Sequence, residues 1–275
     1  MPSIQAGPVA LVGLPYDGSS SFLRGAAEAP PLLRAALAAP SSNTWTESLR
    51  DLGHHDRIHD AGDVSLPDGP GAREKIEAAI AELLDRGFRP LSLGGDHSVT
   101  YPILRAFRGR YPRLTILHLD AHPDLYDELD GDRYSHACPF ARIMEEGLAT
   151  RLVQVGIRTM SGAQRPQAER FNVEVHDMRS WRDDTPLSLG TGPLYVSLDL
   201  DVLDPAFAPG ISHYEPGGMS VRQVLHILQS LPPTIVGADL VEFNPRRDIN
   251  GMTAMVGGKL MKELLDRMLA AGDGD

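Results

Sequence analysis

The chain has 275 residues, 42% of them hydrophobic, and no linker-like block or internal repeat divides it, so one domain with a sizeable core is expected over residues 1–275. A formal net charge of −11 argues against a nucleic-acid or anionic-membrane partner, and the single cysteine, Cys138, excludes an intrachain disulfide. Because there is no signal-like N-terminus and no run of about 18 apolar residues, the protein is expected to be soluble and cytoplasmic.

Short apolar runs along the chain predict buried strands. They lie at residues 9–14, 90–93, 114–117, 152–157, 194–198 and 235–241. Helices are expected between and after them, at residues 28–39, 72–86, 99–108, 221–231 and 255–270. The second helix illustrates the pattern, because Ile76, Ile80 and Leu83 recur every three or four residues and Gly87 follows as a C-cap.

The alternation of strands and helices predicts an α/β protein with three layers, in which helices cover both faces of a doubly wound, mostly parallel sheet. Two segments fall outside this alternation. Residues 41–63 are polar and are expected to form a surface loop, in which His54, His55 and His59 lack the paired acids of a metal site. Residues 270–275 are expected to fray after the last helix.

Histidine and aspartate follow the apolar run at residues 114–117 in the sequence HLDAHPD. Asp120, His122 and Asp124 occupy every second position, so an extended backbone would point all three to one side. Residues four apart would then be separated by roughly 13 Å, whereas the ions of a two-metal site lie about 3.5–4 Å apart. The three side chains can converge only if the chain bends, and Pro123 is compatible with such a bend.

Two further strands end in the same way. Asp199 and Asp201 follow one of them in SLDLDVLDP, and His97 follows another in LGGDHS. Two carboxylates about 4 Å apart repel by about 4 kcal/mol at an effective dielectric constant of about 20, so four gathered carboxylates require cations. A single Asp-x-Asp or His-x-Asp is usually a strand-end turn or a solvated acid, but three such strand ends together predict a metal site. Its oxygen-rich ligands favour Mn or Fe(II) over Zn.

The chain resembles the ureohydrolase (arginase/agmatinase) family. The matching residues are Gly94-Gly95-Asp96-His97-Ser98, the run 119–124, the run 197–210 and Pro216-Gly217-Gly218. Within the family the sequences HPDLYDELDGDRYSHACPFARIMEEG, DPAFAPGISHYEPGG and VGADLVEFNPRRD are most similar to the plant-type arginases. The resemblance spans residues 12–259, and it implies an arginase-like α/β fold.

The resemblance also implies roles for the motif residues. His97 and Asp124 would hold one Mn²⁺ ion, His122 and one acid of the Asp199/Asp201 pair would hold a second, and Asp120 and an acid of that pair would be shared. A hydroxide bridging the two ions would be the nucleophile. His136 would transfer a proton to the leaving amine, and Glu242 would bind the guanidinium group of the substrate. Asp96 is expected to orient ligands or to hold a turn.

The expected reaction is hydrolysis of L-arginine to L-ornithine and urea, with agmatine or another guanidino compound as the alternative substrate. Animal-type arginases have acids that help hold the α-amino group after the strand ending in Gly156-Ile157-Arg158, whereas residues 159–166 contain none here. Three other interpretations are less favoured: a two-metal phosphoesterase, which would need phosphate-binding Arg or Lys; a nucleophilic Cys138; and a metal-binding regulator without activity. The family resemblance implies a homo-oligomer, either a trimer or a hexamer.

Overall fold

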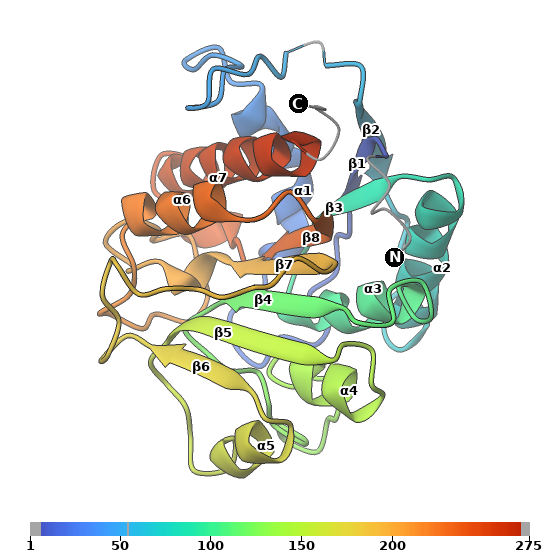
Figure 1. The fold of residues 1–275 in the computed structure, drawn as a ribbon, viewed down its shortest axis with the longest axis vertical. Helices are drawn as coiled ribbons and strands as arrows, with labels where there is room; N and C mark the ends of the chain where they lie inside the picture. Colours follow the sequence, from blue (N-terminus) through green and yellow to red (C-terminus); the bar gives the residue numbers. More distant parts are fainter. Residues whose placement is uncertain (1–6, 54, 271–275) are drawn as a thin grey trace.

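Eight parallel strands form a single sheet in the computed structural model, which describes residues 7–53 and 55–270 (Figure 1). The order of strands across the sheet is β2-β1-β3-β8-β7-β4-β5-β6. In chain order the strands are β1 Val9–Gly13, β2 Ile58–Asp63, β3 Arg89–Leu93, β4 Thr115–Leu119, β5 Arg151–Ile157, β6 Glu174–Asp177, β7 Leu194–Asp199 and β8 Ile235–Val241.

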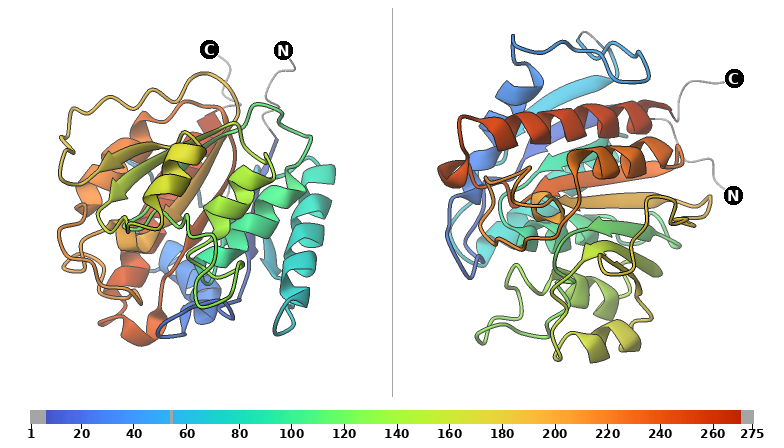
Figure 2. Two further views of the ribbon diagram at one scale, coloured as in Figure 1. Left: turned by 90° about the horizontal axis from the view of Figure 1, so that it is seen from below. Right: turned by 90° about the vertical axis from the view of Figure 1, so that its left-hand side faces the viewer.

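Helices cover both faces of this sheet (Figure 2). Helices α1, α6 and α7 share one hydrophobic core with the sheet, and α2, α3 and α4 share the other. The helices are α1 Ala29–Leu37, α2 Gly71–Asp85, α3 Thr100–Ala106, α4 Pro139–Glu145, α5 Arg165–Arg170, α6 Val221–Ser230 and α7 Met252–Leu269. The predicted three-layer α/β fold is therefore confirmed.

Each strand and helix expected from the apolar pattern is present, with ends that shift by a few residues. The pattern missed β2, β6, α4 and α5. Strands β2 and β6 are the two edges of the sheet, and their polar sequences IHDAGD and EVHD are mostly exposed or half-buried, so neither has the apolar run of a central strand. Helices α4 and α5 have only 7 and 6 residues, too few for a clear helical period.

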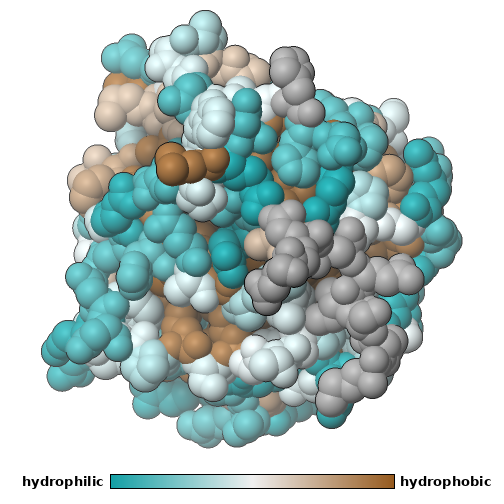
Figure 3. Space-filling view, turned by 45° about the horizontal axis from the view of Figure 1, so that its top comes forward, coloured by the Kyte–Doolittle hydropathy of each residue, from teal (hydrophilic) through white to brown (hydrophobic). Residues whose placement is uncertain are grey.

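The segment predicted as a surface loop therefore ends in an edge strand, and His59 lies exposed on it. Positions 54 and 271–275, which belong to the predicted histidine cluster and the predicted frayed end, lie outside the described residues. None of the described helices is both long and apolar enough to cross a membrane. On the face seen in Figure 3, hydrophilic residues predominate and hydrophobic ones form small separate areas.

The strand order places the polar motifs side by side. Strands β3, β8, β7 and β4 are neighbours at the centre of the sheet. His97 follows β3, residues 120–124 follow β4, Asp199 ends β7, and Glu242 follows β8. Because all four strands are parallel, their carboxyl ends lie along one edge of the sheet, where open α/β sheets bind ligands.

Candidate metal centre and active site

One imidazole nitrogen lies among three carboxylates at this edge. The Nδ1 atom of His97 is 3.1 Å from Asp120 Oδ2, 3.2 Å from Asp124 Oδ2 and 3.1 Å from Asp199 Oδ2. His97 is completely buried, and its Nδ1 atom makes no hydrogen bond of acceptable geometry within the described part of the chain. One imidazole nitrogen with three carboxylates around it is a combination of ligand types that suits a divalent cation.

A second group lies beside the first. The Nδ1 atom of His122 is 2.9 Å from Asp201 Oδ2 and 3.4 Å from Asp120 Oδ1. These three residues have ligand atoms close enough together to hold one ion. Asp120 directs one oxygen toward each group, so it can be shared by two ions. The structure thus brings together all six residues that the sequence predicted as metal ligands, and it places Asp199 with His97 and Asp201 with His122.

Local hydrogen bonds turn the carboxylates toward the centre. Asp199 Oδ1 accepts the backbone N–H of Asp201 at 2.7 Å, and Asp201 Oδ1 accepts the backbone N–H of Ala121 at 3.0 Å. The other oxygen of each carboxylate therefore faces an imidazole. The expected bend after β4 is present, because Asp124 adopts the left-handed region with φ 49°. Few residues other than glycine adopt this conformation, and such strain is concentrated at functional sites.

Hydrogen bonds on the side of His97 away from the carboxylates determine its tautomer. Its Nε2 atom lies 2.9 Å from Ser197 Oγ, and the Ser197 hydroxyl donates to Asp239 Oδ1 at 2.7 Å. Hydroxyls of Tyr195 and Thr100 donate to the other oxygen of Asp239. With the Ser197 hydrogen committed to Asp239, Nε2 of His97 must be the donor, so the lone pair of a neutral imidazole lies on Nδ1 and faces the carboxylates.

His118 is a part of the centre that the sequence interpretation did not assign. It is fully buried on β4, its Nδ1 lies 3.0 Å from the amide nitrogen of Gln154, and its Nε2 lies 2.7 Å from Asp120 Oδ2. Since an amide nitrogen can only donate, the Nε2–H of His118 donates to Asp120 and orients it. The signal was available, because His118 precedes Asp120 by two residues on the same side of the strand.

The charges of the centre are not balanced by protein groups. Burial and the neighbouring acids Asp201 and Asp120 raise the pKa of Asp199 well above its usual value. Burial, followed by Asp120, raises the pKa of Asp201 to about 6. Burial alone would lower the pKa of His97, but its three carboxylates raise it well above the usual value. The raised pKa values mean that these side chains tend to bind protons, because the gathered carboxylates lack compensating positive charge. Bound cations would supply that charge in place of the protons.

His136 and Glu242 form a pair beside the centre. The Nδ1 atom of His136 lies 3.0 Å from Glu242 Oε1, and its Nε2 atom lies 2.8 Å from Ser21 Oγ. Burial would lower the pKa of His136, but Glu242 raises it to about 9. Burial would raise the pKa of Glu242, but His136 lowers it. At neutral pH the pair is therefore an imidazolium and a carboxylate, a proton donor next to an acceptor for a planar cation.

A cavity of about 250 Å³ opens over these residues. Six of the eight predicted residues line it, and the other two, His97 and Asp120, lie beneath it. The sequence interpretation assigned no role to several other lining side chains, which lie in loops away from the strand-end acids and histidines: Ser21, Tyr126, Thr159, Gln164 and His213. The His213 ring lies 5.0 Å from that of His136 and 5.9 Å from that of His122, between centroids.

Two polar residues near the motifs have other positions. Asp96 is fully buried, and it accepts hydrogen bonds from the backbone N–H groups of Ser19 and Ser98, so it holds the loop at residues 17–21 against the site, as predicted for a turn acid. Cys138 is buried outside the cavity lining, and burial raises the pKa of its thiol to about 12. A thiolate nucleophile is therefore disfavoured.

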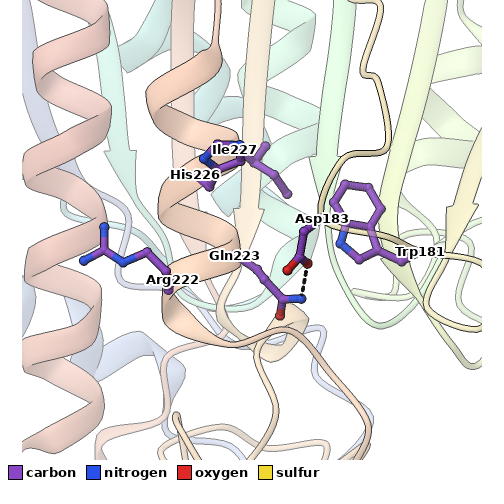
Figure 4. A pocket seen from close by; sticks show the side chains of 6 residues that line it. All are labelled: Trp181, Asp183, Arg222, Gln223, His226 and Ile227. Carbon is purple, nitrogen blue, oxygen red and sulfur yellow. Dashed lines mark hydrogen bonds between the residues drawn. The ribbon is translucent and has the colours of Figure 1, made fainter.

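A second hollow, of about 230 Å³, lies beside α6 (Figure 4). Its lining is Trp181, Asp183, Arg222, Gln223, His226 and Ile227. The amide of Gln223 donates to Asp183 at 2.7 Å. The hollow has one acid and one imidazole in place of the carboxylate cluster, so the cavity over the metal centre is the candidate active site.

Comparison with known proteins gives consistent matches. The model of the family described as "Arginase family" matches residues 7–266. A protein of Arabidopsis thaliana named "Arginase 1, mitochondrial" is 48% identical over 270 residues, which cover 92% of this chain and 79% of that protein. The solved structure of the arginase from Medicago truncatula superposes with a TM-score of 0.90 at 44% identity, covering 96% of this chain and 88% of that one. A chicken protein named "Agmatinase, mitochondrial" is 35% identical, over 93% of this chain and 79% of its own length.

These relatives correct one expectation. The chain was predicted to be cytoplasmic, but several of the plant relatives are named as mitochondrial or as chloroplastic and mitochondrial, which contradicts that prediction. The prediction was wrong because it rested on the lack of a secretory-type signal and of a long apolar run, together with a single cysteine. Those features are compatible with any reducing compartment and do not distinguish the cytoplasm from an organelle.

Proposed function

The chain belongs to the arginase family, and from that membership we propose that it hydrolyses L-arginine to L-ornithine and urea. The observation that supports this most directly is the arrangement at the strand ends: two imidazoles and four carboxylates beneath a cavity, with the His136–Glu242 pair beside them. A guanidino carbon held by Glu242 would lie over the metal centre.

The proposed ligands are the six residues predicted from the sequence, but their division differs: an acid of the Asp199/Asp201 pair was expected to be shared, whereas the distances favour one acid of the pair for each ion. His97, Asp124 and Asp199 would hold one ion, His122 and Asp201 the other, and Asp120 both. The orphaned Nδ1 atom of buried His97 fits this assignment, because a ligand nitrogen needs a lone pair without another partner. The oxygen-rich set favours Mn²⁺. When bound, two such ions lower the pKa of water toward neutrality and stabilise developing negative charge.

The other residues act on the substrate. Glu242, held by the backbone N–H of His97 at 2.9 Å, would accept two parallel N–H bonds from the planar guanidinium group and so fix the plane that is attacked. His136, steadied by Ser21 at 2.8 Å, would donate its proton to the departing amine nitrogen, because its raised pKa keeps it protonated at neutral pH.

The test is a substrate panel. Urea release is measured with purified, Mn²⁺-loaded protein from L-arginine, agmatine and 3-guanidinopropionate, and the specificity constants are compared. The expected result is a preference for L-arginine. Agmatine is the second candidate, because no lysine or arginine lines the described cavity and a substrate without a carboxylate needs none. A tenfold or greater preference for agmatine would overturn the assignment of arginine.

Two further properties are proposed with less direct support. The chain forms one domain, which agrees with the single sheet that receives strands from Val9 to Val241 and with the extent of the family match. It assembles into a trimer or hexamer, an expectation that rests on the family resemblance alone. Light scattering of the purified protein measures the number of chains.

A further inference from the structure

The described cavity offers the amino-acid part of the substrate no guanidinium or ammonium group. Among the described residues, neither lysine nor arginine lines the cavity. The nearby guanidinium of Arg158 is occupied, since it donates to the backbone carbonyls of Glu215 at 2.7 Å and Asp201 at 2.6 Å. Apart from the imidazolium of His136, which is already paired with Glu242 and Ser21, the groups that can donate to a substrate carboxylate are therefore neutral.

Gln164 has the geometry of such a donor. Gln164 is only 2% exposed, yet it lines the cavity. Its Oε1 atom accepts the backbone N–H of Ser161 at 3.1 Å, which decides the orientation of the amide because a backbone N–H needs an acceptor. The Nε2 group is then the free end, and it has no hydrogen-bond partner within residues 7–53 and 55–270. The nitrogen is not one of the buried side-chain atoms that lack a partner in the described structure, so it is accessible from the cavity, where a ligand or water can accept its hydrogen bond.

The chemistry of this group selects one end of an amino acid. An NH₂ donor attracts a carboxylate and offers nothing to an ammonium group, which needs an acceptor. A carboxylate that could pair with an ammonium is also missing from the loop that bears Gln164, because residues 159–166 contain no acid. This loop lies next to the centre, since Arg158 N–H and the Thr159 hydroxyl both donate to the Ala121 carbonyl.

We propose that Gln164 is a specificity-determining residue: its Nε2 group donates a hydrogen bond to the α-carboxylate of the guanidino amino acid, so the substrate is recognised by its carboxylate and not by its ammonium group. This inference rests on the proposed function, because it concerns how arginine is separated from agmatine, which lacks that carboxylate.

The variant Gln164→Glu tests the inference. Glutamate has nearly the same shape and keeps an oxygen for the Ser161 N–H, but it replaces the donor by a negative acceptor. The expected result is a loss of at least about tenfold in kcat/KM for L-arginine, because hydrogen bonds to charged groups are among the strongest, with agmatine unchanged or improved. The matched control is Gln167→Glu, the same substitution three residues further on, at a glutamine outside the cavity lining that accepts from Arg170.

The outcomes separate the two proposals. If the wild-type protein releases no urea from L-arginine, the proposed function fails and the inference fails with it. If wild type hydrolyses L-arginine but Gln164→Glu keeps the arginine-to-agmatine ratio within twofold, only the inference is overturned. A purely structural role for Gln164 would lower both specificity constants together and leave the ratio unchanged, which is the same overturning result.

A second measurement needs no variant and decides the matter if Gln164→Glu does not fold. Wild-type protein is assayed with L-argininamide, which lacks the carboxylate charge, and with 5-guanidinopentanoate, which lacks the amino group. Relative to L-arginine, L-argininamide is expected to lose at least about tenfold in kcat/KM, and 5-guanidinopentanoate is expected to lose less than L-argininamide. The opposite order would show that the ammonium group is recognised and would overturn the inference.

Discussion

At the scale of single residues, the site is defined by which polar atoms have partners and which do not. Each of Asp199 and Asp201 uses one oxygen for the backbone and leaves one for the centre. His97 uses Nε2 for Ser197 and leaves Nδ1 free of hydrogen bonds in the described structure. These hydrogen bonds within the protein orient the side chains toward the centre.

His136→Ala is expected to lower kcat by about 10²–10⁴-fold, because general acid catalysis contributes that much. Metal content, measured by atomic absorption, should remain at the wild-type value, since His136 contacts Ser21 and Glu242 and none of the proposed ligands. A variant within twofold of the wild-type rate would show that His136 is not the proton donor.

At the scale of elements, the central strands differ from the helices that cover them. Strands β3, β4, β7 and β8 are completely buried, and their ends hold the site rigidly. Helix α6 instead depends on local signals at its first turn. Ser220 Oγ accepts the backbone N–H of Gln223 at 3.2 Å, and the Gln223 side chain accepts the Ser220 N–H at 2.8 Å, which forms a capping box.

Ser220→Ala should therefore reduce the free energy of unfolding by about 1 kcal/mol, the usual cost of removing an N-cap hydroxyl. For a chain of this size the melting temperature would fall by roughly 2 °C, with unchanged kcat/KM because α6 does not line the cavity. Ser220→Thr keeps the hydroxyl and is the control. Equal melting temperatures for the alanine and threonine variants would contradict the assigned cap.

At the scale of the whole molecule, the cost of gathering four acids links metal binding to stability. The acids of the centre come from two separate segments, residues 120–124 and 199–201, and all are buried. Like charges so placed repel unless cations or protons compensate them. Folding of the described sheet and loading of the centre are thus thermodynamically coupled.

Removing metal with a chelator should abolish urea release and lower the melting temperature, and Mn²⁺ should restore both more fully than Zn²⁺, because the proposed ligands are mostly carboxylates. The measurement is calorimetry and urea assay on stripped and reloaded protein. Asp124→Ala, stripped and reloaded in parallel, should bind less metal and recover less stability. Full activity of the stripped wild-type protein would exclude a catalytic metal.

The sequence by itself was sufficient for the central strands and for the residues that follow them. Burial of a strand on both faces demands a continuous apolar run, and a histidine or aspartate directly after such a run is visible without coordinates. The direction of the strands was also predicted, because alternating strands and helices indicate a parallel sheet, and parallel strands have their carboxyl ends at one edge. His97, Asp120, His122, Asp124, Asp199 and Asp201 were predicted for these reasons.

Only the tertiary structure decided what surrounds them. The edge strands β2 and β6 face solvent and have no distinctive pattern. The contacts of His118 with Gln154 and of His136 with Glu242 join positions 36 and 106 residues apart, and no local periodicity encodes them. The orientation of Gln164 depends on one backbone N–H in a loop. A sequence pattern records which side of an element is buried, but the partner across a cavity is determined by how distant segments pack.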